Sequence, residues 1–275
     1  MFGVVIIVSL TFLAGTSYGK NGQRCTCNMV HHVQEEFCNS DYALHVMIHA
    51  GVPSPLPGER DLGDINNKYM KYEVEVVESF KEDDFEKGQI INVYSPRHDI
   101  CGKPGLMDEI RGGTSNEYLF VGDIGQIEDG DEFMVITNCN WVEPWEDIGE
   151  SQRDGLRGMY TDCSCTIFPV SGPMDIGDTN ADRFSYDNCF FNPVKAQVLK
   201  VKDCETLHGF CLRQSDRTCR WENTDAFQEC FATRKSSLTT SAAAVTTKEG
   251  CKLFSGRKKR QCLLKFLKNR NNGRK

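Results

Sequence analysis

The chain of 275 residues carries 32 basic and 39 acidic side chains, and it holds 14 cysteines. Its charged fraction of 26% and apolar fraction of 39% exclude a disordered polymer and a protein with several membrane spans. A dense and even set of cysteines is typical of secreted domains held together by disulfides. The formal charge of −7 argues against a nucleic-acid-binding protein.

The net charge conceals two regions of opposite sign. Residues 251–275 hold ten Lys and Arg and no Asp or Glu, so the other 250 residues carry 22 basic against 39 acidic side chains, a net −17. The basic run from Arg257 to Arg260 suits contact with heparan sulfate or other anionic matrix glycans. The same run is equally compatible with a solvated extension or with a processing site for a protease that cleaves after basic residues.

The chain begins with an apolar segment. Residues 1–16 contain an apolar run of about a dozen residues, too short to span a bilayer of ~30 Å as a helix. The segment therefore predicts a secretory signal, and the small residues Ser17 and Gly19 predict cleavage after Gly19. Residues 20–24 would then remain as a short pro-segment ahead of Cys25, so we assign 1–24 to the signal and pro-segment.

Alternating and continuous apolar patterns predict a β-rich domain over residues 25–163. Five strands are expected, at 42–49, 71–77, 89–94, 117–122 and 132–137. Five strands in series with turn signals between them favour a small closed barrel. Helices are predicted around 33–39 and 145–160. The proline-rich segment 52–61 is predicted to be a projecting loop, because proline cannot pair in a central strand.

The rest of the chain lacks clear periodicity. Residues 164–233 show no clear hydrophobic periodicity but are dense in cysteine, which predicts a small domain held together by disulfides. Residues 234–250 read as a Ser/Thr/Ala linker, and the basic tail follows, so we assign 234–275 to linker and tail.

Few residues suggest chemistry of the chain's own. On a strand, His45 and His49 lie ~13 Å apart and cannot share a metal ion, so both are expected to face solvent. His31 and His32 with nearby cysteines have the residue types of a zinc site, but cysteines in an oxidising compartment pair with one another. Nucleophile-elbow, Walker and HExxH motifs are absent from the sequence, so we expect neither an enzyme nor a resident cofactor.

The segment from Cys25 onward resembles the tissue inhibitors of metalloproteinases. Cys25-Thr26-Cys27, followed by Phe37-Cys38-Asn39-Ser40-Asp41, is the opening pattern of that family. The resemblance covers about 25–222, and its further motifs occur in the family's order: Ile100-Cys101-Gly102, Ile136-Thr137-Asn138-Cys139, Pro144-Trp145, Gln152-Arg153, Tyr160 through Cys165, and Cys211 through Trp221.

The resemblance implies a fold and a mechanism. It implies an OB-like barrel of the netrin type, so we expect a mainly β protein with a small disulfide-rich second domain. It also implies that the α-amino nitrogen and carbonyl oxygen of Cys25 chelate the catalytic zinc of a matrix metalloproteinase. In the implied complex, Thr26 enters the protease's S1′ pocket, and Asp99 and Ile100 occupy the unprimed side.

Disulfide pairing also follows from the resemblance. It implies Cys25–Cys101, Cys27–Cys139 and Cys38–Cys163 in the first domain, and Cys165–Cys219 and Cys189–Cys211 in the second. Four further cysteines have no counterpart in this scheme, and we group them as Cys204–Cys230 and Cys251–Cys262.

Two departures from the family pattern bear on function. Residues 20–24 would block the chelating amine if they were retained, and Asn28 stands where the family usually has an aliphatic residue. The leading hypothesis is thus a secreted, monomeric inhibitor whose only zinc is the one it shares with the bound protease. The alternative is a non-inhibitory netrin-module protein of the extracellular matrix or of signalling, which binds anionic glycans through its basic tail.

Overall fold

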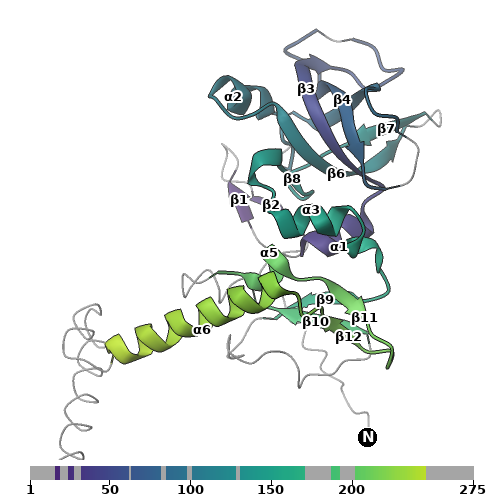
Figure 1. Cartoon of the computed structure of the whole chain (residues 1–275). Helices are drawn as coiled ribbons and strands as arrows, with labels where there is room; N and C mark the ends of the chain where they lie inside the picture. Colours follow the sequence, from purple (N-terminus) through teal and green to yellow (C-terminus); the bar gives the residue numbers. More distant parts are fainter. Residues whose placement is uncertain are drawn as a thin grey trace, which may run out of the picture.

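The structure is a computed structural model in which β-strands dominate the first half of the chain, whereas the second half contains helices and short strands (Figure 1). It describes residues 16–18, 24–27, 32–61, 63–81, 85–97, 101–127, 131–170, 187–192 and 202–245. Within these ranges, no helix combines the length and the apolar character needed to cross a bilayer.

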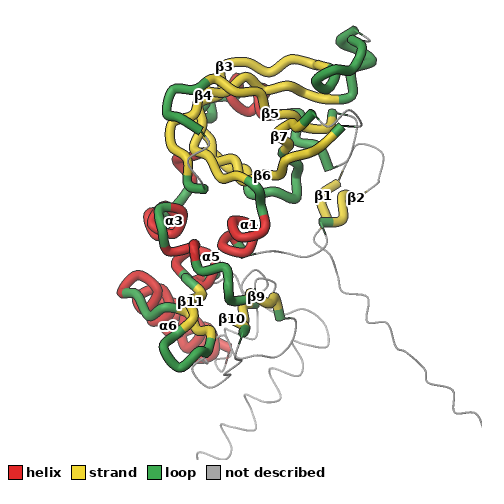
Figure 2. The backbone as a smooth tube through the Cα atoms, turned by 90° about the vertical axis from the view of Figure 1, so that its right-hand side faces the viewer, coloured by secondary structure: helices red, strands yellow, loops and turns green. Residues whose placement is uncertain are grey.

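Five strands close into a ring, which is visible in Figure 2. In order around the ring they are β3 (Tyr42–Ser54), β4 (Tyr69–Ser79), β5 (Ile90–Pro96), β7 (Glu132–Val135) and β6 (Glu117–Gln126), and β6 pairs back onto β3. A sixth strand, β8 (Val142–Pro144), pairs with β6. The predicted closed barrel is therefore confirmed.

Alternate residues of each strand fill the barrel, because successive side chains of a strand point to opposite faces. Tyr42, Leu44, Val46 and Ile48 of β3 are all buried in the core, as the pattern predicts. The register of β3 against β4 shifts after His45 and again after Ile48. Such bulges bend a strand, and the bend lets β3 pair with both β4 and β6.

Close packing at the seam between β3 and β6 requires a glycine. The Tyr42 hydroxyl donates a hydrogen bond to the Val135 carbonyl across 3.0 Å, and Gly122 of β6 lies beneath this bond. A Cβ at Gly122 would overlap both the hydroxyl and the carbonyl oxygen.

The predicted loop over 52–61 begins as a strand, so that prediction is wrong for its first three residues. Val52–Ser54 belong to β3 and pair with β4. The pairing of β3 with β6 ends at Met47, so Pro53 lies where β3 has a partner on one side only. A proline is tolerated at such an edge because its missing N–H leaves no ladder bond unmade.

The prediction that His45 faces solvent is also wrong. His45 is 5% exposed and stacks on Trp145, with ring centroids 3.9 Å apart. Trp145 begins the 3₁₀ helix η1 (Trp145–Asp147), which precedes α3 (Glu150–Leu156) and η2 (Met159–Thr161). These helices cover the outer face of the barrel at this point, so the outward side of β3 is buried there. His49 lies beyond their cover and is exposed.

The remaining elements of the first domain flank the barrel. Helix α1 (Val33–Asn39) agrees with the helix predicted there, and α2 (Leu106–Arg111) was not predicted. Strand β1 (Thr16–Tyr18) pairs with β2 (Arg24–Thr26) beside the barrel.

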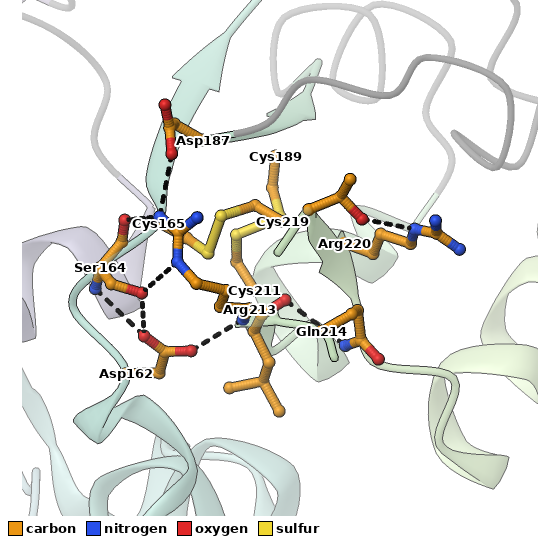
Figure 3. Close-up of a disulfide and its surroundings, with 12 residues drawn as sticks. Asp162, Ser164, Cys165, Asp187, Cys189, Cys211, Arg213, Gln214, Cys219 and Arg220 are labelled. Atoms are coloured by element: carbon orange, nitrogen blue, oxygen red, sulfur yellow. Dashed lines mark hydrogen bonds and ion pairs between the residues drawn. A yellow bond between two sulfur atoms is a disulfide. The ribbon is translucent and has the colours of Figure 1, made fainter. Parts of the chain in front are cut away.

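A second module follows Cys163. It contains a parallel pair, β9 (Thr166–Pro169) and β10 (Asn188–Phe191), and an antiparallel pair, β11 (Cys211–Arg213) and β12 (Cys219–Trp221). The disulfides Cys165–Cys219 and Cys189–Cys211 join the two pairs (Figure 3). With Ile167 and Phe191, these four cysteines form a small buried core among the described residues.

One arginine ties this module together. Figure 3 shows the guanidinium of Arg213 between the segments that begin the parallel pair. It donates to the Ser164 carbonyl at 2.7 Å and to the Asp187 carboxylate at 3.0 Å. The backbone N–H of Arg213 donates to Asp162 at 2.7 Å. Burial would raise the pKa of Asp162, but hydrogen bonds from Ser164 and Arg213 outweigh it and hold that pKa below its usual value.

The chain then forms α5 (Cys204–His208) and, after β12, the long helix α6 (Asp225–Val245). The linker predicted from residue 234 is wrong for its first part, because α6 continues through it. Extending an existing helix costs less than starting one, and the alanines of this stretch favour it. Figure 1 shows α6 extending sideways from the second module, so that its C-terminal end lies to the left of the module in this view.

Candidate functional site

Two of the residues singled out by the sequence, Cys27 and Cys101, lie at one edge of the barrel, against the turn that contains Cys139. We call this region the cysteine edge and define it by Cys27, the segment 101–103 and the turn 137–140. The backbones of Cys25 and Thr26 lie in β2, where Cys25 pairs with Ser17 of β1. Asn28, Asp99 and Ile100, and with them their predicted contacts, lie outside the described residues.

A disulfide attaches the N-terminal segment to the barrel. Cys27 pairs with Cys139, with their Cα atoms 5.2 Å apart. Cys101 is also disulfide-bonded, although the pair with Cys25 implied by the resemblance falls outside the described side chains. A second bridge, Cys38–Cys163, holds the end of α1. The described bridges Cys27–Cys139 and Cys38–Cys163 are pairs that the resemblance implied.

A polar cavity of about 260 Å³ opens beside the Cys27–Cys139 bridge. Oxygen and amide groups dominate its lining, which comprises Glu36, Asn39, Ser40, Asp123, Thr137 and Asn140 together with the two cysteines. The Asn140 amide donates to Asp123 at 3.1 Å, so part of this lining is bonded to itself.

The turn 137–140 is closed by its own hydrogen bonds. The backbone N–H and the hydroxyl of Thr137 both donate to the Asn140 side-chain oxygen at 2.8 Å. The Cys139 N–H donates to the Thr137 hydroxyl oxygen at 3.1 Å. Side chains of this kind compete with the backbone for hydrogen bonds and favour turns.

This turn also holds the segment that begins at Cys101. The backbone N–H of Asn138 donates to the Cys101 carbonyl at 2.7 Å, and its side-chain amide donates to the Gly102 carbonyl at 2.7 Å. Gly102 forms a β-bridge with Thr137. No role was predicted for Thr137 or Asn138, although two asparagines and a threonine around Cys139 are typical of a structured turn.

Lys103, which follows Cys101 and Gly102, is also bonded to the barrel. Its N–H donates to the buried Ser95 hydroxyl at 2.7 Å, and its carbonyl accepts from the Tyr72 hydroxyl at 2.8 Å. Its ammonium group donates to the Val142 carbonyl. Burial lowers the pKa of Lys103, against the attraction of Glu109 and Glu143.

Behind the cysteine edge, α1 joins the barrel to the second module. Figure 1 shows α1 and α3 between the two. Gln34 is 1% exposed, and its side-chain amide makes two hydrogen bonds to the backbone of Cys211, as a neighbouring strand would. Its oxygen accepts from the Cys211 N–H at 2.7 Å, and its amide donates to the Cys211 carbonyl at 2.9 Å. Phe210 completes the joint by packing into the same cluster as Phe37 and Tyr160.

Three of the four histidines considered as metal ligands have other partners, and the fourth, His31, lies outside the described residues. His45 contacts the Glu117 carboxylate at 3.0 Å, and His49 contacts Glu75 at 3.1 Å. His32 caps α1, and its ring contacts the Glu205 carbonyl at 2.8 Å. Over the part of the chain that the structure describes, no group of three or more histidine, cysteine or acidic residues is arranged to hold a metal ion.

Of the four cysteines without a counterpart in the family scheme, the structure describes one pair. Cys204 pairs with Cys230, as predicted, and so joins α5 to α6. Cys251 and Cys262 lie outside the described residues.

Comparisons with known proteins place these features in context. A family model described as tissue inhibitor of metalloproteinase matches residues 23–221. Metalloproteinase inhibitor 4 of Mus musculus is 28% identical over 204 residues, which cover 73% of this chain and 81% of that protein. Metalloproteinase inhibitor 2 of Gallus gallus is 28% identical over 200 residues (72% and 80%). Metalloproteinase inhibitor 3 of Scyliorhinus torazame is 26% identical over 226 residues (80% and 92%).

Proposed function

The chain belongs to the tissue inhibitor of metalloproteinase family, and from this premise we propose that it inhibits by placing mature Cys25 on a protease's catalytic zinc. Membership of this family makes the protein a secreted metalloproteinase inhibitor and not an enzyme. We propose in addition that the amine and carbonyl of Cys25 bind the zinc, that cleavage before Cys25 frees the amine, and that the cysteine edge holds Cys25 in place.

The chemistry requires a free α-amino group at Cys25. Such a group has a pKa of ~8, low enough for a nearby Zn²⁺ to hold it deprotonated as a ligand. The amino nitrogen and the carbonyl oxygen of Cys25 would together displace the water that the protease uses for hydrolysis. The zinc belongs to the protease, and the inhibitor contributes no metal of its own.

The observation that carries the proposal is the rigidity of the cysteine edge. Two residues after Cys25, Cys27 is bonded covalently to Cys139, and the turn that holds Cys139 also holds Cys101 and Gly102. Affinity is lost when a flexible segment must be ordered on binding. An N-terminus tied to a closed barrel avoids most of that cost. In this arrangement Thr26 would enter the S1′ pocket, with Asn28 beyond it and Asp99 and Ile100 on the unprimed side.

Maturation decides whether this surface can act. With residues 1–24 attached, the nitrogen of Cys25 is part of a peptide bond and its strand pairs with β1. Removal of residues 1–24 takes away β1 and frees the amine. We propose that cleavage before Cys25, either directly or after a first cut at Gly19, is the activating step.

The test compares two proteins that differ by one residue. A chain beginning at Cys25 should titrate a matrix metalloproteinase catalytic domain stoichiometrically. The same chain beginning at Arg24 should inhibit about 100-fold less or not at all, because the extra residue removes the chelating amine. Equal thermal stability of the two proteins would show that the loss is local. Equal inhibition by both would refute chelation.

The charge split favours a second candidate function. A chain that keeps residues 20–24 could not chelate zinc, yet it would retain the ten basic residues of the tail. Such a protein would be a netrin-module component of the matrix that binds anionic glycans. The N-terminal residue of protein recovered from tissue separates the two candidates: Cys25 supports the inhibitor, and Lys20 supports the alternative. For both we propose a monomer.

A further inference from the structure

Two segments meet at the turn 137–140 by different kinds of bond. Cys139 holds Cys27 through a disulfide, and Asn138, one residue earlier, holds Cys101 and Gly102 through hydrogen bonds. The spacing between the two segments is therefore set by the conformation of two adjacent residues in one turn.

The two bonds of Asn138 differ in what a substitution can remove. Its backbone N–H reaches the Cys101 carbonyl whatever the side chain is, whereas the bond to the Gly102 carbonyl needs the side-chain amide. Asn138 is exposed at the surface, while Gly102 is buried. The side chain thus lies over the segment from outside and leaves the barrel core untouched.

The rest of the segment is already fixed at Lys103, through Ser95 and Tyr72 on the barrel. Cys101 and Gly102 extend from this fixed point toward the turn 137–140. The Asn138 side chain contacts the segment at Gly102, the residue between its fixed end and Cys101, so the loss of this bond would loosen the segment at Gly102.

We propose that Asn138 is a positioning residue of the inhibitory surface, whose side-chain amide fixes the segment 101–102 at a set distance from the Cys27–Cys139 bridge. The inference rests on the proposed function and deepens it. Asn138 touches neither zinc nor any reacting atom. It acts by keeping the segment 101–102 beside the Cys27–Cys139 bridge, and the segment and the bridge together hold the N-terminus. Loss of the Asn138 amide should therefore weaken inhibition without unfolding the protein.

The test replaces the donor by an acceptor of the same size. Asn138→Asp turns a carboxylate oxygen toward the Gly102 carbonyl, so the bond is lost and the two oxygens repel. In the full chain beginning at Cys25, we expect about tenfold weaker inhibition of a metalloproteinase catalytic domain, chiefly through faster dissociation. The melting temperature should stay within about 2 °C of wild type, because one surface bond is changed.

A matched control makes the same chemical change elsewhere on the barrel. Asn116 precedes β6, and its amide donates to the Ile48 carbonyl at 3.4 Å. Asn116→Asp should leave the inhibition constant within twofold of wild type. Hydrogen exchange supplies a readout that does not depend on a protease: amides in a peptide covering 101–104 should exchange faster in N138D and at the wild-type rate in N116D.

The outcomes separate the inference from its premise. A wild-type chain that begins at Cys25 and fails to inhibit would overturn the proposed function and the positioning role with it. If the wild type inhibits and N138D inhibits equally well, the positioning role alone is wrong. Unchanged exchange over 101–104 in N138D would also overturn it. Weaker inhibition, unchanged melting and faster local exchange together would support it.

Discussion

His32 lies where α1 meets the second module, and its protonation state is fixed by its neighbours. It is fully buried, and its Nδ1 accepts a hydrogen bond from the Gln34 N–H, so Nε2 must carry the proton that is donated to the Glu205 carbonyl. Its ring also contacts Phe191 and Trp221 edge-on or tilted. A second proton would turn the accepting nitrogen into a donor and break the cap of α1.

Stability should therefore fall in acid because of this histidine. Burial lowers the pKa of His32 to about 4, against smaller raising effects of Glu205 and Glu35. An unfolded chain binds the proton below its ordinary pKa of about 6.5, so the stabilisation is complete above pH 6.5 and is lost progressively toward pH 4. We expect this residue to remove about 2 kcal/mol from the free energy of unfolding between pH 7 and pH 5.

The measurement compares urea denaturation of the wild type and His32→Asn at both pH values, with disulfides intact. Asparagine can still cap α1 but does not titrate, so the variant should be less stable at pH 7 yet lose about 2 kcal/mol less on acidification. His45 and His208, whose pKa values burial also lowers, are present in both proteins and cancel in the comparison. Identical pH dependence in the two proteins would contradict the assignment.

At the scale of elements, the sequence predicted most where periodicity was strong. The strands that close the barrel and the helix at 33–39 follow from apolar alternation and from length. The buried state of His45 did not, because the helices that cover it come a hundred residues later in the chain. Asn138 and Gln34 were missed for a similar reason: each bonds to a backbone group far away in the sequence, and local pattern carries no sign of that.

Helix α6 is the element furthest from expectation, and its anchor is a buried ion pair. Arg234 is 3% exposed, and its guanidinium makes two hydrogen bonds to the Glu205 carboxylate, at 2.7 and 3.0 Å. It also stacks on Phe231 with 4.1 Å to the ring centroid. Removing one member of a buried pair leaves an unpaired buried charge, which costs more than replacing both members.

We therefore expect Arg234→Met to lower the free energy of unfolding by about 3–5 kcal/mol, and the double variant R234M/E205M to recover most of that loss. The control is Arg111→Met on α2, which breaks an ion pair with Asp108 whose side chains are 72% and 83% exposed. That variant should change stability by less than about 0.5 kcal/mol. Urea denaturation of the four proteins tests the prediction, which fails if R234M is as stable as R111M.

The whole molecule combines a body, made of the barrel and the second module, with a strongly basic C-terminal tail. The barrel and the second module share the buried bonds of Gln34 and His32, and α6 is tied to the second module by Cys204–Cys230 and by Arg234. The cysteine edge is part of the barrel, whereas the basic tail follows α6 at the far end of the chain. Along the sequence the two regions are separated by the second module and α6, so each can be altered without changing residues of the other.

Tail and edge should accordingly act independently. Without residues 251–275 the protein has a strongly negative net charge and should be repelled by heparin, whereas the full chain should be retained and released by salt, since salt screens exposed charges. Replacing Arg257, Lys258, Lys259 and Arg260 by alanine should lower the salt needed for elution, and L263S/L264S, which keeps every charge, should not. The inhibition constant should stay within twofold of wild type in all three variants. Retention of the truncated chain would place the glycan contact on the body, and weaker inhibition would mean that the tail reaches the protease.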